Sequence, residues 1–339
     1  MIVVFGAAGF IGTYFIDKLI HDGFDVLAVD KCKIGEDYYN SRSIPFINCD
    51  ITSKKNIDRL PKNNINAIVH LACMQPANMS ENTYNPTDFF TVNVMGTMNI
   101  LEYCKTRKIP KIIYMCSHRN TQGLWANAKK AISEDDGISI KYTGEYSLFS
   151  ISETAASECV HHYSHQYGIQ GIILRIPPVY GYGPHTEIYK NGKPLITGFK
   201  IFIENALAGK PIEVWGNPQN GRDIIYVKDV VSAMVSAIGS DTANGLYNIS
   251  SGRLLTLEEQ AKIIAKIFST GGSVSDIKYV PEKDNYIESY VYDISKSKRE
   301  LNWSPRYSFE QMIIDYKNEM ELGRFDFLVE KRKRMLKNS

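Results

Sequence analysis

The stretch that decides the fold is IVVFGAAGFIG, residues Ile2–Gly12. Its four apolar residues indicate a buried strand, and a Gly-x-x-Gly-x-x-Gly spacing follows, just before an amphipathic helix at Thr13–Ile20. Glycines at this spacing allow a tight turn and a close approach of backbone to phosphate, while the helix N-terminus offers unpaired N–H groups. We therefore expect a dinucleotide pyrophosphate to lie against Gly6, Ala8, Gly9, Phe10, Ile11 and Gly12.

An acidic residue follows at the distance that such a turn requires. Asp30 ends the second predicted strand, 18 residues after Gly12. A carboxylate there accepts hydrogen bonds from the adenosine ribose hydroxyls and repels a 2′-phosphate, which favours NAD over NADP. Lys31 and Lys33 follow directly, and a cation at either position is able to hold a 2′-phosphate. NAD is the expected cofactor, and NADP remains the alternative.

Short apolar segments continue to alternate with helix-like segments through the first half of the chain. Most are continuous rather than alternating in polarity, as is typical of parallel strands buried on both faces. This order predicts a doubly wound, parallel α/β sheet of the Rossmann type, formed by an NAD-binding domain at residues 1–178. The expected strands are Ile2–Phe5, Asp25–Asp30, Pro45–Cys49, Ala67–Ala72, Lys111–Cys116 and Gly171–Arg175.

The pattern changes after Tyr180, where turn-forming Gly, Pro and Asn residues gather. We expect residues 179–325 to form a smaller α/β lobe that covers a substrate cleft, although part of it can return to the main sheet. The basic run Lys331–Arg334 predicts a solvated tail at residues 326–339. Helices are expected in this lobe at Ile201–Ala208, Val227–Ile238, Leu257–Ile267 and Phe309–Lys317.

The composition narrows the class of protein. The net charge is only +2, so no overall field points to nucleic acid or a membrane surface as a partner. No apolar run reaches the roughly 18 residues of a membrane span, and no targeting segment is expected before Ile2. The six cysteines form no CxxC pair, which favours a reduced, cytoplasmic protein. His161, His162 and His165 find only Glu158 as a further ligand on the same helix, so we expect no metal site.

Motifs further along the chain resemble the extended short-chain dehydrogenase/reductase family, whose members mostly modify nucleotide sugars. Asn93–Asn99 matches its N-V-x-G-T-x-N motif, and Arg175–Gly181 is similar to its R-P-x-N-V-Y-G motif. Gly221–Val227 resembles its R-D-F-I-Y-V segment, and Leu301–Pro305 its L-G-W-x-P. These matches occur in the family's order. The resemblance implies an NAD-dependent epimerase or dehydratase.

The resemblance also implies further cofactor contacts. Asp50 and Ile51 stand where the family touches adenine, and Leu71, Ala72 and Cys73 where its fourth strand runs against the cofactor. Ser117 occupies the family's catalytic Ser/Thr position at the end of the fifth strand. The remaining residues implied to lie at the cofactor are Lys31, Asn93, Cys116 and Pro177.

One family feature is missing. Members carry a Tyr and a Lys four residues apart on the helix after the fifth strand, where the Tyr transfers a proton and the Lys stabilises the tyrosinate. With Glu158 taken as the family's glutamate, this pair falls on Ser150 and Thr154. A serine hydroxyl is much less acidic than a phenol, and threonine has no charge that could lower a neighbour's pKa.

Several interpretations stay open. An enzyme could use another acid or base, with Tyr146 beside Ser117 as first choice and His118 as second. A different alignment of this helix is a further possibility. The protein could also bind NAD and a nucleotide sugar while turning over slowly or not at all, or it could be a net NAD-dependent dehydrogenase or reductase.

The resemblance implies substrate contacts as well. Arg222 falls where an Arg pairs with the nucleotide diphosphate, unless it pairs with a carboxylate such as Asp223 instead. Lys283 aligns with a second phosphate-binding Arg, and Trp215 with an aromatic near the base, or packs in the core. Pro178 replaces the usual Asn and removes one hydrogen bond to the substrate. The family often dimerises through four helices, here supplied by Phe89–Lys105 and Thr154–Tyr167, so we expect a homodimer.

Overall fold

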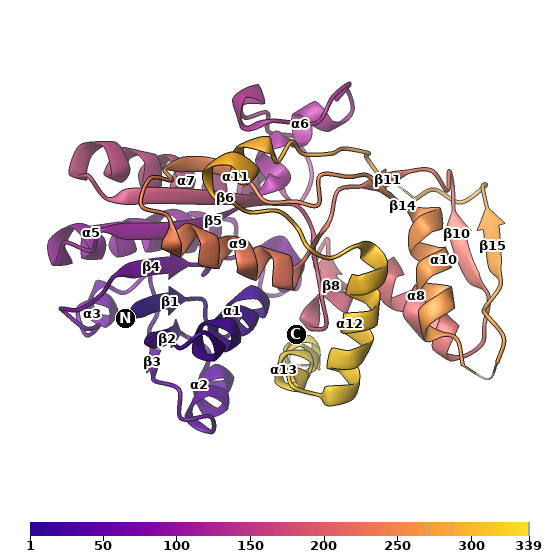
Figure 1. Ribbon diagram of the computed structural model, residues 1–339, viewed down its shortest axis with the longest axis horizontal. Coiled ribbons are helices and arrows are strands. Elements are labelled where there is room, and N and C mark those ends of the chain that lie inside the picture. Colours follow the sequence, from indigo (N-terminus) through magenta and orange to yellow (C-terminus); the bar gives the residue numbers. More distant parts are fainter. Residues whose placement is uncertain (271, 286, 338–339) are drawn as a thin grey trace.

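A seven-stranded parallel sheet forms the centre of the molecule (Figure 1). The structure is a computed structural model that describes residues 1–337 apart from 271 and 286. The strand order β13-β6-β5-β4-β1-β2-β3 is that of a doubly wound sheet, and every pairing is parallel, which confirms the predicted fold class. The strands are β1 (Ile2–Phe5), β2 (Val26–Asp30), β3 (Phe46–Asn48), β4 (Ala67–His70), β5 (Lys111–Ser117), β6 (Gln170–Ile176) and β13 (Gly245–Asn248).

Helices cover both faces of this sheet, and each face has its own apolar core. Val4 points into a core that includes residues of α1 (Phe10–His21), α2 (Lys33–Asn40) and α9 (Val227–Gly239). Its neighbour Val3 points into the opposite core. Alternate residues of β1 are thus buried on opposite faces, which explains why the strand is continuously apolar. The second face is covered by α3 (Lys54–Ile57), α5 (Thr97–Arg107) and α7 (Ser147–Tyr167).

The helices of the second face differ from the expected ones in two ways. The predicted single helix from Phe89 contains a π-helical segment, η2 (Phe89–Gly96), which passes directly into α5. Gly96 lets this segment pack closely on Ile51, because a Cβ at this position would lie 2.6 Å from Cδ1 of Ile51 and would force that side chain to move. Helix α7 begins at Ser147, seven residues or about two turns earlier than predicted, and Phe149 in its first turn lines the cavity described below, as does Tyr146 just before it.

The C-terminal part forms a smaller lobe, yet it also completes the main sheet. After a first section of the lobe, α9 and β13 return to the Rossmann layers, where α9 packs on α1 and β13 pairs with β6. The lobe itself holds α8 (Gly198–Leu207), α10 (Leu257–Phe268) and α12 (Phe309–Leu322). Its strand pairs are β7 (Val179–Tyr180) with β12 (Ile225–Tyr226), β8 (Glu187–Lys190) with β9 (Lys193–Ile196), β10 (Ile212–Trp215) with β15 (Ile277–Val280), and β11 (Gly221–Arg222) with β14 (Leu255–Thr256).

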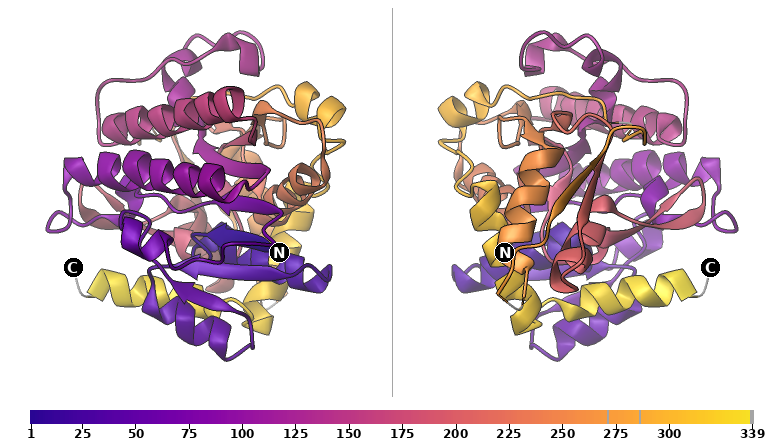
Figure 2. Two further views of the ribbon diagram at one scale, coloured as in Figure 1. Left: turned by 90° about the vertical axis from the view of Figure 1, so that its left-hand side faces the viewer. Right: turned by 90° about the vertical axis from the view of Figure 1, so that its right-hand side faces the viewer.

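The basic C-terminal segment is not a solvated tail. It forms a helix, α13 (Asp326–Lys337), that runs beside α2 (Figure 2), while residues 338 and 339 lie outside the described residues. Leu328 and Arg332 are 2% and 5% exposed, because they share one face of the helix at i, i+4 spacing. The prediction missed this because a long cationic side chain becomes buried when its donors find carbonyl partners.

No helix in the described part of the chain is both long and apolar enough to cross a bilayer.

Short elements connect the larger ones. The connecting elements are η1 (Pro76–Asn78), α4 (Pro86–Asp88), η3 (His118–Thr121), α6 (Gln122–Trp125), η4 (Glu134–Asp136), η5 (Pro184–Thr186) and α11 (Ser295–Glu300).

Candidate active site

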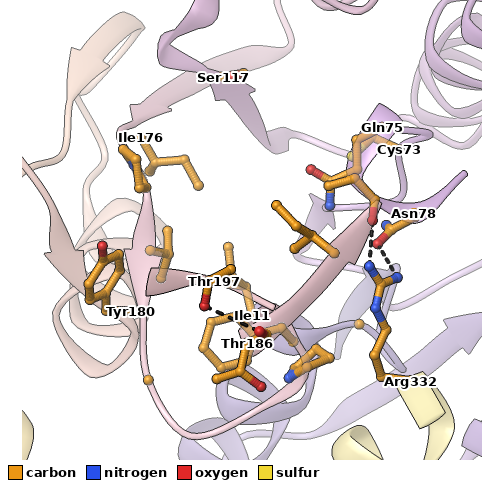
Figure 3. Close-up of a pocket in the computed structure, with 18 of the residues that line it drawn as sticks. Ile11, Cys73, Gln75, Asn78, Ser117, Ile176, Tyr180, Thr186, Thr197 and Arg332 are labelled. Carbon is orange, nitrogen blue, oxygen red and sulfur yellow. Dashed lines mark hydrogen bonds between the residues drawn. The ribbon is translucent and has the colours of Figure 1, made fainter. Parts of the chain in front are cut away.

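A large cavity lies between the carboxyl ends of the sheet strands and the smaller lobe (Figure 3). Its volume is about 1480 Å³, whereas a pocket for one ligand usually measures roughly 300–1,000 Å³. The carboxyl edge of an open parallel sheet is the usual ligand site of this architecture. The cavity is therefore large enough for two ligands placed end to end.

The glycine-rich turn lines this cavity. Gly6 has a φ of +79°, and a Cβ there would lie 2.6 Å from the backbone nitrogen of Ala72. A Cβ on Gly12 would lie 2.3 Å from the carbonyl oxygen of Gly6. Helix α1 starts directly after Gly9 with no side chain capping its first turn. Its leading N–H groups are thus available to an anion, and the shape of the turn is compatible with a dinucleotide pyrophosphate.

Asp30 both holds this turn and faces the cavity. Its Oδ2 accepts a hydrogen bond from the backbone N–H of Ala8 at 3.0 Å, and its Oδ1 accepts one from Cys32 at 2.9 Å. The carboxylate keeps lone pairs for ribose hydroxyls. The predicted cofactor residues that line the cavity are Gly6, Ala8, Gly9, Phe10, Ile11, Gly12, Asp30, Lys31, Asp50, Ile51, Leu71, Ala72, Cys73, Cys116, Ser117 and Pro177.

Asn93 is the exception among the predicted cofactor residues, because it does not line the cavity. Its side chain exchanges two hydrogen bonds with the backbone of Met74, at 2.7 and 3.0 Å, and donates a third to Oγ of Ser152. All its polar atoms are used within the protein. Asn93 therefore acts indirectly, by fixing Met74 in the cavity wall against helix α7.

Helix α7 presents different residues to the cavity from those expected. The side chains of Ser150 and Thr154 hydrogen-bond to carbonyl oxygens one turn earlier in their own helix, at 2.8 and 2.7 Å, and neither residue lines the cavity. Phe149 and Glu153, each one position earlier, do line it. Each residue advances an α-helix by about 100°, so the predicted pair, which lies one position too late in the sequence, points away from the cavity. The two cavity-facing positions four residues apart hold Phe and Glu in place of Tyr and Lys.

Glu153 is a buried carboxyl group in the cavity wall. Glu153 is 3% exposed, and its Oε1 accepts a hydrogen bond from the phenol of Tyr114 at 3.3 Å. Burial raises the pKa of Glu153 to about 8, although hydrogen bonds from Tyr114 and the backbone of Ser117 oppose this shift. A carboxyl with this pKa exchanges protons near neutral pH, as a general acid or base must.

Tyr146 lies in the cavity wall beside a cation. The guanidinium carbon of Arg119 lies 3.9 Å from the centre of its ring. Burial raises the pKa of Tyr146, and the charge of Arg119 partly opposes this shift. The phenol is consequently a proton donor rather than a base at neutral pH. Arg119 itself was not predicted, although it stands two residues after Ser117 and also lines the cavity.

His118, the second acid–base candidate, is held in an aromatic stack. Its ring is parallel to that of Trp125 within 8°, and Tyr290 stacks with both. Its Nδ1 lies 3.1 Å from the carbonyl oxygen of Ile176. Burial, with the nearby charge of Arg119, lowers the pKa of His118 well below its ordinary value. The imidazole is therefore neutral and serves mainly to build the cavity wall.

Arg222 is a cation that lines the cavity. The alternative partner, Asp223, instead accepts hydrogen bonds from Ser251, Gly252 and Tyr292. In the part of the chain that the structure describes, no hydrogen bond or ion pair engages the guanidinium of Arg222, which lines the cavity. Such a group is suited to bind phosphate oxygens.

Two of the other predicted substrate residues also line the cavity, and one does not. Trp215 is 46% exposed and lines the cavity, so it is not a core residue, and Pro178 lines it as well. Lys283 is absent from the cavity wall. Its ammonium pairs with Glu213 at 2.9 Å and lies 4.4 Å from the centre of the Trp215 ring. Lys283 thus supports Trp215 rather than facing a ligand.

Sequence reasoning missed the parts of the wall that come from the lobe and the C-terminus. The hairpin β8–β9 contributes Ile188 and Leu195, and α13 contributes Lys331 and Arg332. Figure 3 shows Arg332 hydrogen-bonded to Asn78 in this wall. The described residues contain no group of three or more His, Cys, Asp or Glu side chains that could hold a metal ion.

Known proteins resemble this chain over almost its whole length. A putative UDP-glucose 4-epimerase of Methanocaldococcus jannaschii is 28% identical over 95% of this chain and 98% of its own. A UDP-glucuronate 4-epimerase of Thermodesulfobacterium geofontis is 25% identical over 91% and 92%. The crystal structure of UDP-glucose 4-epimerase from Thermotoga maritima with UDP-glucose has a TM-score of 0.76 at 24% identity, covering 95% of this chain and 99% of that chain, and shows the same fold.

The sequence profile of one family covers most of the molecule. It matches residues 2–250, from the first strand of the sheet to the end of the seventh, β13. This range includes the glycine-rich turn, Asp30, helix α7 and Arg222. The chain belongs to the NAD-dependent epimerase/dehydratase family.

Proposed function

We propose that the protein binds NAD and a nucleotide sugar in this cavity and acts as an NAD-dependent epimerase or dehydratase. One observation carries the proposal: the same cavity is lined by the glycine-rich turn and by Arg222, whose guanidinium has no partner in the described part of the chain. NAD, when bound, takes a hydride from the sugar and later returns it. The relatives named as UDP-sugar 4-epimerases support this substrate class.

At the dinucleotide end, backbone groups bind the cofactor. The first N–H groups of α1 donate to the pyrophosphate, and Asp30 accepts from the adenosine ribose. The negative charge of Asp30 disfavours a 2′-phosphate, so NAD is preferred to NADP. Asp50 and Ile51 line the wall beyond, on the side where the adenine is expected.

At the sugar-nucleotide end, Arg222 donates to the diphosphate, and Trp215 offers an aromatic surface to the base. Both lie in the cavity wall. Pro178, which has no side-chain donor, leaves one side of the sugar free of a hydrogen bond. The protein therefore fixes this substrate chiefly through its diphosphate.

Proton transfer falls to residues other than a Tyr–Lys pair. We assign it to Glu153, whose carboxylate accepts the proton of the sugar hydroxyl while that carbon is oxidised, and returns the proton in the reverse step. Ser117 lines the same wall and is a hydrogen-bond partner for the hydroxyl. Tyr146 supplies a neutral phenol as a second donor. A base with a pKa near the working pH is the most effective kind.

A second candidate function is binding without turnover. It is favoured by Phe149, which puts an inert ring where the family carries its proton-transferring phenol. A protein of this kind would hold NAD and a nucleotide sugar tightly and leave both unchanged.

One experiment separates these functions. The purified protein is incubated at high concentration with UDP-, dTDP- and GDP-sugars and NAD, and product formation is followed together with absorbance at 340 nm. A new sugar product with at most a transient absorbance supports the epimerase or dehydratase. Stoichiometric, lasting NADH indicates a net dehydrogenase. Saturable binding of both ligands without product supports the binding protein, and absence of NAD binding at millimolar concentration contradicts all three.

We also propose that the protein is a cytoplasmic homodimer. Helices α5 and α7 lie side by side on one face of the sheet (Figure 2, left). Phe90 and Met95, on η2 beside them, are 40% and 57% exposed, and an interface would cover such apolar side chains. All six cysteines are free, which suits a reducing compartment. Analytical ultracentrifugation of wild type and Met95→Glu tests the dimer.

A further inference from the structure

The C-terminal helix α13 is built into the cavity rather than laid on the surface. Arg332 is almost fully buried, and its guanidinium makes three hydrogen bonds to two separate parts of the protein. Nε donates to the carbonyl oxygen of Glu187 in β8 at 2.7 Å. Nη1 donates to Oδ1 of Asn78 at 3.0 Å, and Nη2 donates to the carbonyl oxygen of Ala77 at 2.5 Å. One side chain thus ties the lobe's hairpin to the loop after β4.

Aromatic contacts fix the start of the same segment to the dinucleotide-binding half. Phe325 stacks on Tyr14 of α1 with ring centres 3.9 Å apart, and Phe327 stacks on Tyr38 of α2 at 3.7 Å. The phenol of Tyr182 donates to Oδ1 of Asp326 at 2.5 Å. These contacts explain why a segment rich in Lys and Arg folds back as a helix and does not extend into solvent.

Lys331 is the residue that this arrangement carries to the dinucleotide end. Its Nζ donates to the carbonyl oxygen of Ala8, within the glycine-rich turn, at 2.8 Å. Both residues line the cavity, as do Asp30 and Lys31. The ammonium group has three N–H donors and uses one on this carbonyl. Two donors and a full positive charge therefore remain beside the turn that is suited to bind a pyrophosphate.

We propose that Lys331 is a dinucleotide-binding residue, delivered across the cavity by α13 and locked there by Arg332. Its ammonium group donates to a phosphate oxygen of the dinucleotide while it remains bonded to Ala8. The glycine-rich turn supplies only neutral N–H donors to that phosphate, and Lys331 adds a formal charge, so the pair neutralises it better than the turn alone. The inference rests on the proposed binding of NAD.

The test uses the full-length protein and three single substitutions. Lys331→Met removes the charge and keeps an unbranched apolar stem. Lys333→Met is the matched control, because Lys333 is two residues away on the same helix and exposed. Arg332→Lys keeps a charge and removes the planar fork that joins β8 to η1. The affinity and the dissociation rate of NAD are measured by calorimetry and stopped-flow fluorescence at two salt concentrations.

We expect Lys331→Met to weaken NAD binding by about tenfold, the typical effect of losing one charge-assisted hydrogen bond, and to reduce the salt dependence. Lys333→Met should bind NAD as the wild type does. Arg332→Lys should speed NAD dissociation, because α13 is held less firmly. Equal affinities of Lys331→Met and Lys333→Met would overturn the proposal.

A deletion of residues 324–339 covers the case in which a substitution merely disturbs α13. If the helix holds the dinucleotide, the deletion accelerates NAD dissociation while circular dichroism shows a folded protein. Tighter or faster NAD binding after the deletion would show that α13 obstructs the site, which contradicts the proposal. If the wild type itself binds no NAD, the proposed function fails, and that outcome is distinct from normal binding by all variants.

Discussion

The carboxyl group of Glu153 and the phenol of Tyr114 are joined by a hydrogen bond of 3.3 Å inside the wall of the cavity. Tyr114 lies on β5 and Glu153 on α7, so the bond links the sheet to the helix that carries the family's reactive groups. It orients the carboxyl, and it supports the charged form against the burial that raises the pKa. This link makes Glu153 the first residue to test.

Replacement of Glu153 by Gln keeps the shape of the side chain and removes its ability to accept a proton. We expect turnover to fall by roughly 10²–10⁴-fold, the usual contribution of a positioned acid or base, while NAD affinity stays within a few-fold of wild type. Steady-state kinetics and calorimetry measure the two quantities. Tyr114→Phe is the control: it removes the hydrogen bond alone and should cost much less. Wild-type turnover in Glu153→Gln would exclude the assignment.

The pH dependence of activity should report the same group. The pKa of Glu153 is raised to about 8, so the carboxylate form needed to accept a proton increases as pH rises toward and past that value. We expect turnover to rise from pH 6 to 9 in the wild type. Glu153→Gln should lose this rise in its residual activity. A flat wild-type profile across this range contradicts the prediction.

The free energy of unfolding should fall as pH rises, whereas turnover should increase. A carboxyl whose pKa rises on folding contributes stability that is fully present below the unfolded pKa of about 4.5. That stability is lost as pH rises through about 8, because the folded protein must then hold a buried charge. Urea unfolding of wild type and Glu153→Gln at pH 5 and pH 9 checks this. The wild type should lose stability relative to the variant between those values.

The register of α7 can be tested by restoring the family pair. In the double variant Phe149→Tyr with Glu153→Lys, both new side chains face the cavity one turn apart, and the Lys charge lowers the pKa of the new Tyr. We expect turnover of a nucleotide sugar to equal or exceed that of wild type. The matched control puts Tyr and Lys at Ser150 and Thr154. Because Ser150 is buried and bonded within the helix, this control should be inactive and less stable by about 1–3 kcal/mol.

Arg222 should matter for the nucleotide sugar and not for NAD. Arg222→Met removes a charge-assisted contact to phosphate, so the KM for the sugar nucleotide should rise by roughly 10- to 100-fold, with the Kd for NAD unchanged. Lys283→Met is the comparison, since Lys283 pairs with Glu213 and does not line the cavity. Its effect on KM should be small. Equal effects of the two variants would contradict the roles given to them.

Sequence patterns located most of the sheet and the dinucleotide end because those features follow local rules. A continuous apolar run such as Ile2–Phe5 has one favourable place, the centre of a parallel sheet. The glycine turn is fixed by backbone geometry, so Gly6 and Gly12 allow no other side chain. These features depend on neighbouring residues, which a sequence displays directly.

The rest depends on contacts between distant residues. The alignment on Glu158 was wrong by one position. The residue four positions after the cavity-facing Glu153 is Ser157, and the sequence does not show which of these two residues, Ser157 or Glu158, lies on the same helix face as Glu153. Lys283 aligned with a phosphate-binding residue, but its partner Glu213 lies 70 positions earlier. Likewise, the residues near Arg332 in the sequence do not predict that its guanidinium binds the carbonyl oxygens of Ala77 and Glu187.

The return of the chain to β13 has a consequence for how the protein folds. The seventh strand, Gly245–Asn248, pairs with β6 only after some 70 residues of lobe have been made, and Arg175 on β6 donates to Oδ1 of Asn248 at 2.7 Å. A fragment that stops at residue 178 would therefore leave β6 as an unpaired edge strand. It would also expose the face of α1 that α9 covers. We therefore expect the two halves to complete their folding together, because β13 covers the edge of β6 and α9 packs on α1.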